Sequence, residues 1–221
     1  QARARRFAHA IKTARKALKL EGGEASVDAL SALAYSLLGS KKYAEAHDTA
    51  VKLEQADPDS PLAAKVRAEA NLEQQEWAEA IVALEEYKLR RPFDPYAYKK
   101  LAKLYMQLGQ TDKALPNLIE LHRRTMKDPK YARQVADIYR MSDTPEKAID
   151  YYEQVIQINP YDAGAYTAMG SLYLRGGQYD RAVLATRSAC LVEPKNSDHW
   201  ARLAMVHYRA ALAEKNSDRL S

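Results

Sequence analysis

The segment GGQYDRA (residues 176–182) places two adjacent glycines before a tyrosine and an alanine that stand three residues apart. Two glycines in a row are compatible with a loop that binds a ligand and with a turn that separates two helices. The same spacing of an aromatic residue and an alanine occurs upstream at Tyr43 and Ala46, and again at Trp77 and Ala80. The segment is therefore one copy of a repeated pattern, and we expect its glycines to form a turn between two helices.

The repeat has a period of 34 residues, which several columns of equivalent positions share. One column contains only alanine, at Ala46, Ala80, Ala114, Ala148 and Ala182. A second column of small residues consists of Ala34, Ala68, Ala102, Ala136, Gly170 and Ala204. Prolines follow the alanines of the first column at Pro58, Pro92, Pro160 and Pro194. Such regular periodicity predicts stacked copies of one structural unit.

Each period predicts two amphipathic helices joined by a short polar break. Apolar residues spaced by three and four mark one face of the first helix, as at Tyr98, Leu101, Ala102 and Tyr105. Small residues at the crossing point let the two helices approach closely. Proline ends the second helix because it lacks an N–H and disfavours helix in the preceding residue.

These columns resemble those of the tetratricopeptide repeat family, whose unit is a 34-residue helix–turn–helix. The resemblance covers nearly the whole chain and implies an all-α fold, a right-handed α-solenoid of such repeats. We expect a single array over residues 1–221. Its five full repeats span residues 27–60, 61–94, 95–128, 129–162 and 163–196. The second helix of a partial repeat precedes them (residues 1–26), and the first helix of a further repeat follows (residues 197–221).

Some residues depart from this pattern, among them Thr111 and Pro145, which replace the aromatic residue of their column. Arg67 and Asn71 occupy columns that are otherwise mostly apolar, so we expect either a local shift in helix register or a looser core there. Cys190 is the one cysteine of the chain and has apolar neighbours at helical spacing, which predicts a buried thiol rather than a reactive one.

Composition limits the possible classes of protein. Hydrophobic residues make up 47% of the chain and charged residues 29%, yet no apolar run is long enough for a transmembrane helix. The first residue is not methionine and no signal peptide is recognisable, so we expect a segment of a longer protein. The cellular location is therefore left open.

The formal net charge of +5 arises mostly from the first 20 residues, which contain no acidic residue. Contact with RNA or an anionic membrane is one interpretation of this segment. The favoured one is the solvated face of an ordinary helix, because Phe7, Ile11, Ala14 and Leu18 form an apolar stripe that can pack on the next repeat. Nucleic acid is therefore not a favoured partner. The basic residues are Arg3, Arg5, Arg6, Lys12, Arg15, Lys16 and Lys19.

Motifs of catalysis and cofactor binding are missing from the sequence. The five histidines are scattered over different repeats without an HExxH pair, and no glycine-rich phosphate loop or GxSxG motif occurs. We therefore predict a protein that is not an enzyme and that has no metal or cofactor.

The resemblance implies that the first helices of the repeats line a concave groove that binds a peptide or a segment of a partner protein. Basic residues predominate there from the third repeat onward, which favours an acidic or carboxylate-bearing segment; solvated surface charges are the alternative. A structural spacer or self-assembly domain of a larger protein is the alternative function, with homo-oligomers formed through the open ends of the array. The predicted groove residues are Tyr96, Lys99, Lys103, Met106, Arg133, Arg140, Arg175, Tyr208 and Arg209.

Overall fold

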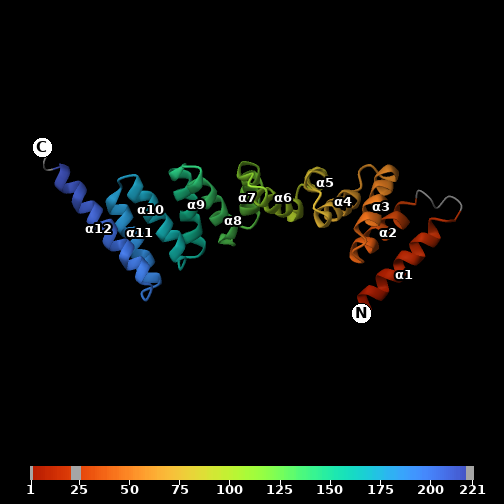
Figure 1. Ribbon diagram of the computed structural model, residues 1–221, viewed down its shortest axis with the longest axis horizontal. Helices are drawn as coiled ribbons and strands as arrows, with labels where there is room; N and C mark the ends of the chain where they lie inside the picture. The colour runs from red at the N-terminus through yellow and green to blue at the C-terminus, as the bar shows by residue number, and fades with distance from the viewer. Residues whose placement is uncertain (1, 21–25, 218–221) are drawn as a thin grey trace. The chain divides into compact units, whose positions relative to one another are not determined.

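The computed structural model describes residues 2–20 and 26–217, which form twelve α-helices and no strand (Figure 1). The expected all-α class of helix–turn–helix repeats is confirmed. The partial repeats predicted at residues 1–26 and 197–221 extend into residues outside this description. The helices are α1 (Ala2–Ala17), α2 (Val27–Gly39), α3 (Tyr43–Ala56), α4 (Pro61–Gln74), α5 (Trp77–Arg90), α6 (Pro95–Gln107), α7 (Thr111–Arg124), α8 (Pro129–Met141), α9 (Pro145–Ile158), α10 (Ala163–Arg175), α11 (Tyr179–Val192) and α12 (Ser197–Ser217).

Aspartates begin several of the helices. The carboxylates of Asp94, Asp128 and Asp162 accept hydrogen bonds from backbone N–H groups in the first turns of α6, α8 and α10. Each bond satisfies a donor that has no partner within its helix. At the other end, α5 and α11 stop two residues before Pro92 and Pro194, as expected for proline after a helix.

A left-handed residue joins the two helices of each repeat at the same position of the 34-residue period. Gly109 and Gly177 have φ angles of 70° and 69°, which confirms the predicted turn. Lys41, Gln75 and Asp143 adopt the same conformation, with φ angles of 59°, 63° and 52°. The turn is thus a property of the repeat, and glycine only makes it less costly, because a Cβ atom is crowded in this region.

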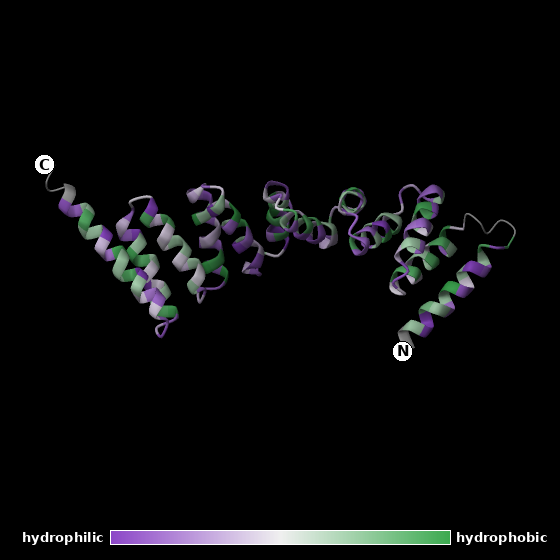
Figure 2. Cartoon of the chain, viewed as in Figure 1, coloured by the Kyte–Doolittle hydropathy of each residue, from purple (hydrophilic) through white to green (hydrophobic). Residues whose placement is uncertain are grey.

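The helices group into two compact units, Gln1–Gly109 with α1 to α6 and Gln110–Ser221 with α7 to α12. Within each unit, each helix packs on the helix that follows it in the chain. In the first unit α2 also packs on α4, so alternate helices lie side by side. Figure 2 shows apolar and polar residues sharing each helix, as expected where one face is buried.

The predicted small-residue columns lie at the helix crossings. All five alanines of the first column are fully buried, and Ala34, Ala68, Ala102 and Ala136 of the second are at most 3% exposed. Cys190 is fully buried as well, which confirms the core position predicted for it, and burial raises the pKa of its thiol. Close packing at small residues is therefore the main architectural rule of both units.

Arg67 and Asn71 remain in helical register, and a charge network replaces the apolar contacts of their columns. Arg67 of α4 forms ion pairs with Glu54 of α3 and, at 2.9 Å, with Glu86 of α5. Arg90 of α5 pairs with Glu54 at 3.2 Å. Asn71 is 2% exposed, and its Oδ1 accepts no hydrogen bond from the described residues. The expected register shift does not occur, because carboxylates on both neighbouring helices neutralise the guanidinium group of Arg67.

The apolar stripe of α1 packs on the first unit as expected. Ile11 and Ala14 are buried in a cluster with residues of α2 and α3, and Leu18 packs against it. The ring of Phe7 lies against Gly39 so closely that a Cβ atom at Gly39 would be 2.5 Å from it. Among the residues that the structure describes, no helix is long and apolar enough to cross a membrane.

Candidate functional site

A pocket of about 260 Å³ in the second unit collects three arginines on the face formed by α8, α10 and α12. Arg133 and Arg140 come from α8, and Arg202 comes from α12. Both α8 residues were predicted to line the groove. The other residues that line the pocket are Asp137, Tyr152, Gly164, Thr167, Ala168 and Ser171.

Arg140 is held by two neighbours on the pocket wall. Its Nε donates a hydrogen bond of 3.1 Å to the hydroxyl oxygen of Tyr152, and that hydroxyl donates one of 2.6 Å to Oδ1 of Asp137. The guanidinium of Arg140 also lies 3.4 Å from Asp137. Burial and the hydrogen bond to Asp137 raise the pKa of Tyr152 to about 12. Tyr152 is thus a neutral donor at physiological pH, and it orients both charged groups.

Arg133 is paired with a carboxylate from the next repeat. Its guanidinium forms an ion pair with Asp162, the residue that precedes α10. Gly164 leaves room for this contact, because a Cβ atom there would lie 3.2 Å from Nη1 of Arg133. The positive charge of Arg133 at the pocket is therefore neutralised by Asp162.

Arg202 is the arginine of this pocket that retains an uncompensated charge. Within the described part of the chain it forms no hydrogen bond or ion pair, and it is exposed. It also borders a small neighbouring pocket of about 100 Å³, whose apolar lining includes Leu174, Met205 and Val206. A carboxylate and an adjacent apolar group could be accommodated side by side around Arg202.

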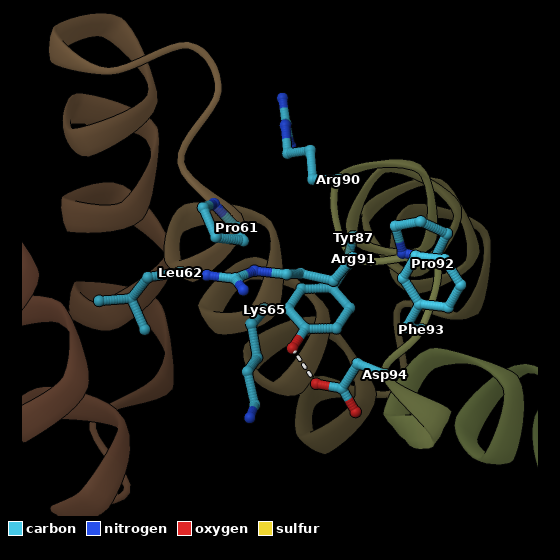
Figure 3. Close-up of a pocket in the computed structure, with 9 residues that line it drawn as sticks. All are labelled: Pro61, Leu62, Lys65, Tyr87, Arg90, Arg91, Pro92, Phe93 and Asp94. Carbon is cyan, nitrogen blue, oxygen red and sulfur yellow. Dashed lines mark hydrogen bonds between the residues drawn. The ribbon is translucent and has the colours of Figure 1, made fainter.

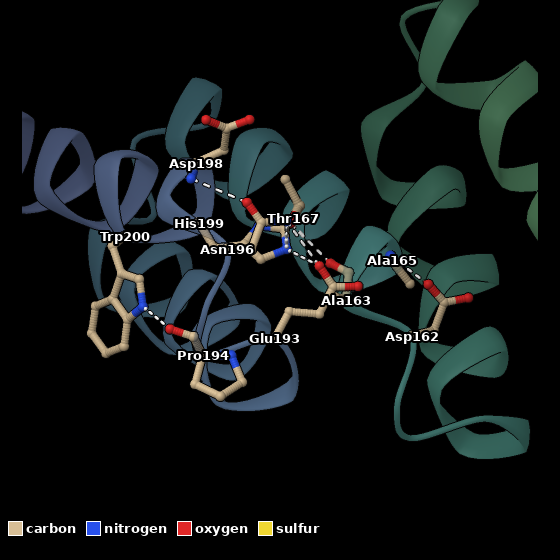
Figure 4. A network of polar contacts seen from close by, with 10 residues as sticks. All are labelled: Asp162, Ala163, Ala165, Thr167, Glu193, Pro194, Asn196, Asp198, His199 and Trp200. Atoms are coloured by element: carbon tan, nitrogen blue, oxygen red, sulfur yellow. Dashed lines mark hydrogen bonds and ion pairs between the residues drawn. The ribbon is translucent and has the colours of Figure 1, made fainter.

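The start of α12, which carries Arg202, is fixed by a polar network around His199 (Figure 4). The ring atom Nδ1 lies 3.3 Å from Oγ1 of Thr167 on α10, and Nε2 lies 2.9 Å from Oε2 of Glu193. Hydrogen bonds from Asn196 and His199 lower the pKa of Glu193. Trp200 Nε1 donates to the backbone oxygen of Pro194 at 2.9 Å. These contacts hold α12 against α10 and hence set the width of the pocket.

Three of the predicted groove residues in the second unit lie outside this pocket. Arg175 is exposed at the end of α10 and lies 3.7 Å from Asp143. Tyr208, which is 60% exposed, and Arg209 are on the solvent side of α12. The structure therefore brings together only Arg133 and Arg140 of the predicted set in this unit.

In the first unit, the four predicted residues of α6 divide into two groups. Tyr96 donates a hydrogen bond of 2.8 Å to Glu69 of α4, and the ammonium group of Lys65 lies 4.6 Å from the centre of its ring. Lys99, Lys103 and Met106 are exposed. Tyr96 therefore connects two repeats, whereas the other three are available to a partner.

Arg202 and Tyr152 are pocket residues that the sequence argument did not select. Arg202 lies 34 residues after Ala168, so its place on the first-helix face could have been found from the period. Tyr152 belongs to a second helix, and only its long side chain reaches the pocket. No periodic signal marks such a contact.

A second surface pocket, of about 480 Å³, lies beside the loop between α5 and α6 (Figure 3). Tyr87 donates a hydrogen bond to Asp94 there, and the exposed ring of Phe93 forms one wall. Burial and the bond to Asp94 raise the pKa of Tyr87 to about 12, while the hydrogen bond from Tyr87 lowers the pKa of Asp94. The cap of α6 is thereby tied to α5.

Within the residues that the structure describes, no group of three or more His, Cys, Asp or Glu side chains is placed to hold a metal ion. The polar chemistry of the candidate site is therefore that of its arginines and hydroxyl groups.

Three protein-family models match parts of the chain. Two family models described as tetratricopeptide repeat match residues 99–163 and 151–183. A family model described as anaphase-promoting complex, cyclosome, subunit 3 matches residues 4–87. Among curated protein sequences, none matches the chain.

Solved structures with the same fold are distant in sequence. A structure described as YrrB, a TPR protein with an unusual peptide-binding site, has a TM-score of 0.60 and 17% identity, with 91% of this chain and 97% of that chain covered. A structure of MamA protein has a TM-score of 0.57 and 20% identity, with 80% and 96% covered. The APC/C hetero-tetramer Cut9-Hcn1 has a TM-score of 0.50 and 18% identity, with 91% and 40% covered.

Proposed function

Because the chain is a tetratricopeptide-repeat protein, we propose that it is a non-catalytic scaffold that binds an acidic or carboxylate-bearing segment of a partner protein. Repeats of this family are generally interaction modules without enzymatic activity. The similar structure of YrrB is described as having a peptide-binding site, which supports binding by a fold of this kind. We further propose that the first helices of the repeats form the binding surface.

The unpaired charge of Arg202 is the observation that most directly supports this function. Three guanidinium groups surround the pocket, and Asp137 and Asp162 neutralise only two of them. A carboxylate that enters the pocket would pair with Arg202 and accept charge-assisted hydrogen bonds. The adjacent apolar pocket would bind an apolar side chain next to that carboxylate. Lys99 and Lys103 of the first unit are proposed as further contacts for acidic residues.

The test compares binding of labelled peptides to the full chain and to Arg202→Glu. Fluorescein-labelled peptides with one central Glu next to Leu, or with Gln in place of the Glu, serve as probes in an anisotropy titration. We expect the Glu peptide to bind more tightly, and Arg202→Glu to weaken it about tenfold or more, as for a lost charge pair.

Arg187→Glu is the matched control, because Arg187 is exposed on α11 and does not line the pocket. It changes the net charge equally and should leave affinity nearly unchanged at moderate salt. Equal weakening by both variants would show a general charge effect and would refute the assignment to the pocket. Equal affinity of the wild-type chain for both peptides would also refute it.

A self-assembly role is the second candidate, and the exposed apolar residues of α12 favour it. Trp200 is 48% exposed and Leu212 is 42% exposed, and both lie on α12, the last of the described helices. Contact between two copies would remove this surface from water. Light scattering over a range of concentrations tests this role; a constant monomeric mass up to the highest concentration would exclude it.

A further inference from the structure

The first unit contains a cleft whose chemistry differs from that of the arginine pocket. It has a volume of about 660 Å³ and is formed by residues of α1, α2, α3 and α4. Two kinds of side chain line it: aromatic residues on one side and two carboxylates of α4 on the other. The residues that matter here are Phe7, Tyr35, Gly39, Tyr43, Glu69 and Glu73.

The aromatic side is a preformed apolar platform. Phe7 packs on Gly39, and its ring meets that of Tyr35 edge to face, with centroids 6.4 Å apart and an interplanar angle of 66°. Tyr35 is nonetheless 53% exposed, so a large part of its ring remains open to a ligand. Such a surface favours an alkyl chain and attracts a cation over the ring faces.

The acidic side presents one carboxylate that is already paired and one that is not. Glu69 accepts a hydrogen bond of 2.8 Å from the hydroxyl of Tyr96 and one of 3.0 Å from the ammonium group of Lys100. Glu73 lies one helical turn further along α4 and forms no ion pair with the described residues. Tyr43 lines the same cleft as Glu73, and burial together with the interaction with Glu73 raises the pKa of its hydroxyl.

Two lysines also border the cleft, but neither neutralises Glu73. The ammonium group of Lys65 lies 4.6 Å from the ring centre of Tyr96 and 5.9 Å from that of Tyr87, on the side of the neighbouring pocket drawn in Figure 3. Lys41 occupies the left-handed turn after α2 and is exposed. The two lysines balance the two carboxylates of the lining in formal charge, but neither forms an ion pair with Glu73, so the carboxylate of Glu73 remains available to a cation.

From this geometry we infer that the cleft of the first unit binds a lysine or arginine side chain of a partner protein segment, with the alkyl stem on Phe7 and Tyr35 and the cationic head at Glu73. Long basic side chains bury their stems on apolar surface while the charged end finds a carboxylate. The inference is independent of the arginine pocket, which lies in the other unit and selects the opposite charge.

The experiment titrates the full chain with three fluorescein-labelled, end-blocked pentapeptides that differ only at the central residue. That residue is lysine, norleucine or glutamate in an alanine background, so norleucine keeps the alkyl stem and removes the charge. We expect the lysine peptide to bind about fivefold more tightly than the norleucine peptide, and the glutamate peptide to bind most weakly.

Glu73→Gln separates the charge from the platform. It should abolish the preference for lysine over norleucine, whereas Glu79→Gln, an equal change of charge at an exposed position of α5, should preserve it. Tyr35→Ser should weaken both peptides by a similar factor, because it removes part of the surface on which the stem lies. Circular dichroism checks that all three variants remain helical.

Arg202→Glu is included so that this inference and the proposed acidic-segment site can fail separately. It should leave the lysine peptide unaffected. Equal binding of lysine and norleucine peptides to the wild-type chain would overturn the inference, and so would an unchanged lysine preference in Glu73→Gln. Absence of binding by all three peptides at millimolar concentration would overturn it as well.

Discussion

Helices α10 and α11 approach each other closely at Gly170. Whether Gly170→Ala stabilises or destabilises the chain therefore depends on a second residue, Thr186. A Cβ atom at Gly170 would lie 2.5 Å from Oγ1 of Thr186, well inside van der Waals contact. The next nearest atoms, the Thr186 nitrogen and the Ala182 oxygen, would lie at 3.4 and 3.5 Å, which is ordinary contact. The obstacle to Gly170→Ala is therefore a single hydroxyl oxygen, which donates to Ala182 at 2.7 Å.

Two opposing terms determine the free energy of unfolding of Gly170→Ala. Overpacking of a close-packed contact costs about 1–3 kcal/mol, whereas alanine in a helix interior gains about 0.5–1 kcal/mol over glycine. We therefore expect a net destabilisation of about 0–2.5 kcal/mol in the wild-type background. In a Thr186→Ala background the clash disappears, and the same substitution should stabilise the chain by about 0.5–1 kcal/mol.

Urea unfolding of the four chains that make up this double-mutant cycle measures the coupling. Fluorescence of Trp200 on α12, in a Trp77→Phe background, reports on the second unit, and circular dichroism reports on all helices. A coupling energy of about 1–3 kcal/mol between Gly170 and Thr186 is expected. If Gly170→Ala changes the stability equally in both backgrounds, the close contact does not govern this crossing and the reasoning is wrong.

Four further predictions test separate features of the fold. Arg67→Ala should destabilise the chain by about 1–3 kcal/mol, because the partly buried carboxylates of Glu54 and Glu86 would then share Arg90 as their remaining cation. Arg123→Ala, with a side chain 74% exposed, should cost less than about 0.5 kcal/mol in urea unfolding. Tyr87 has a pKa of about 12 in the folded chain, above its ordinary value near 10. The contribution of the Tyr87 hydroxyl to folding stability is therefore complete below pH 10 and is lost as the pH rises towards 12. Tyr87→Phe should reduce the fall in Tm over this pH interval. An identical fall in the wild-type chain and in Tyr87→Phe would contradict the assignment. His199→Ala should loosen the start of α12, seen as faster amide exchange there with no change in α8. Gln75→Gly should raise stability by about 0.5–1 kcal/mol, since Gln75 has a φ of 63°, and thermal unfolding measures it.

The architecture could be derived from the sequence because it depends on local periodicity. Apolar residues at spacings of three and four mark the buried face of a helix wherever that helix lies. The fully buried alanines at Ala46, Ala80 and Ala148 show how closely the 34-residue columns report packing. The glycines of GGQYDRA likewise form the expected turn, with Gly177 at a φ of 69°.

The same reasoning missed the left-handed turns of the other repeats. Lys41, Gln75 and Asp143 carry no glycine signal, yet the helices on either side impose the conformation on them. The intrinsic conformational preference of a single residue contributes little free energy here. The packing of two amphipathic helices against each other outweighs that preference. A turn position could be predicted from the period, but not from the residue type.

The proposed binding surfaces depend on contacts between repeats, which no local pattern encodes. The sequence indicated a basic groove, and Arg133 and Arg140 do line a pocket. It could not show that Asp162 neutralises Arg133 while Arg202 remains unpaired, since these residues are far apart in the chain and meet only when first helices stack. Periodicity determines which face of each helix is buried; the partner of each exposed charge is set by three-dimensional stacking, because charges interact through space and not along the chain.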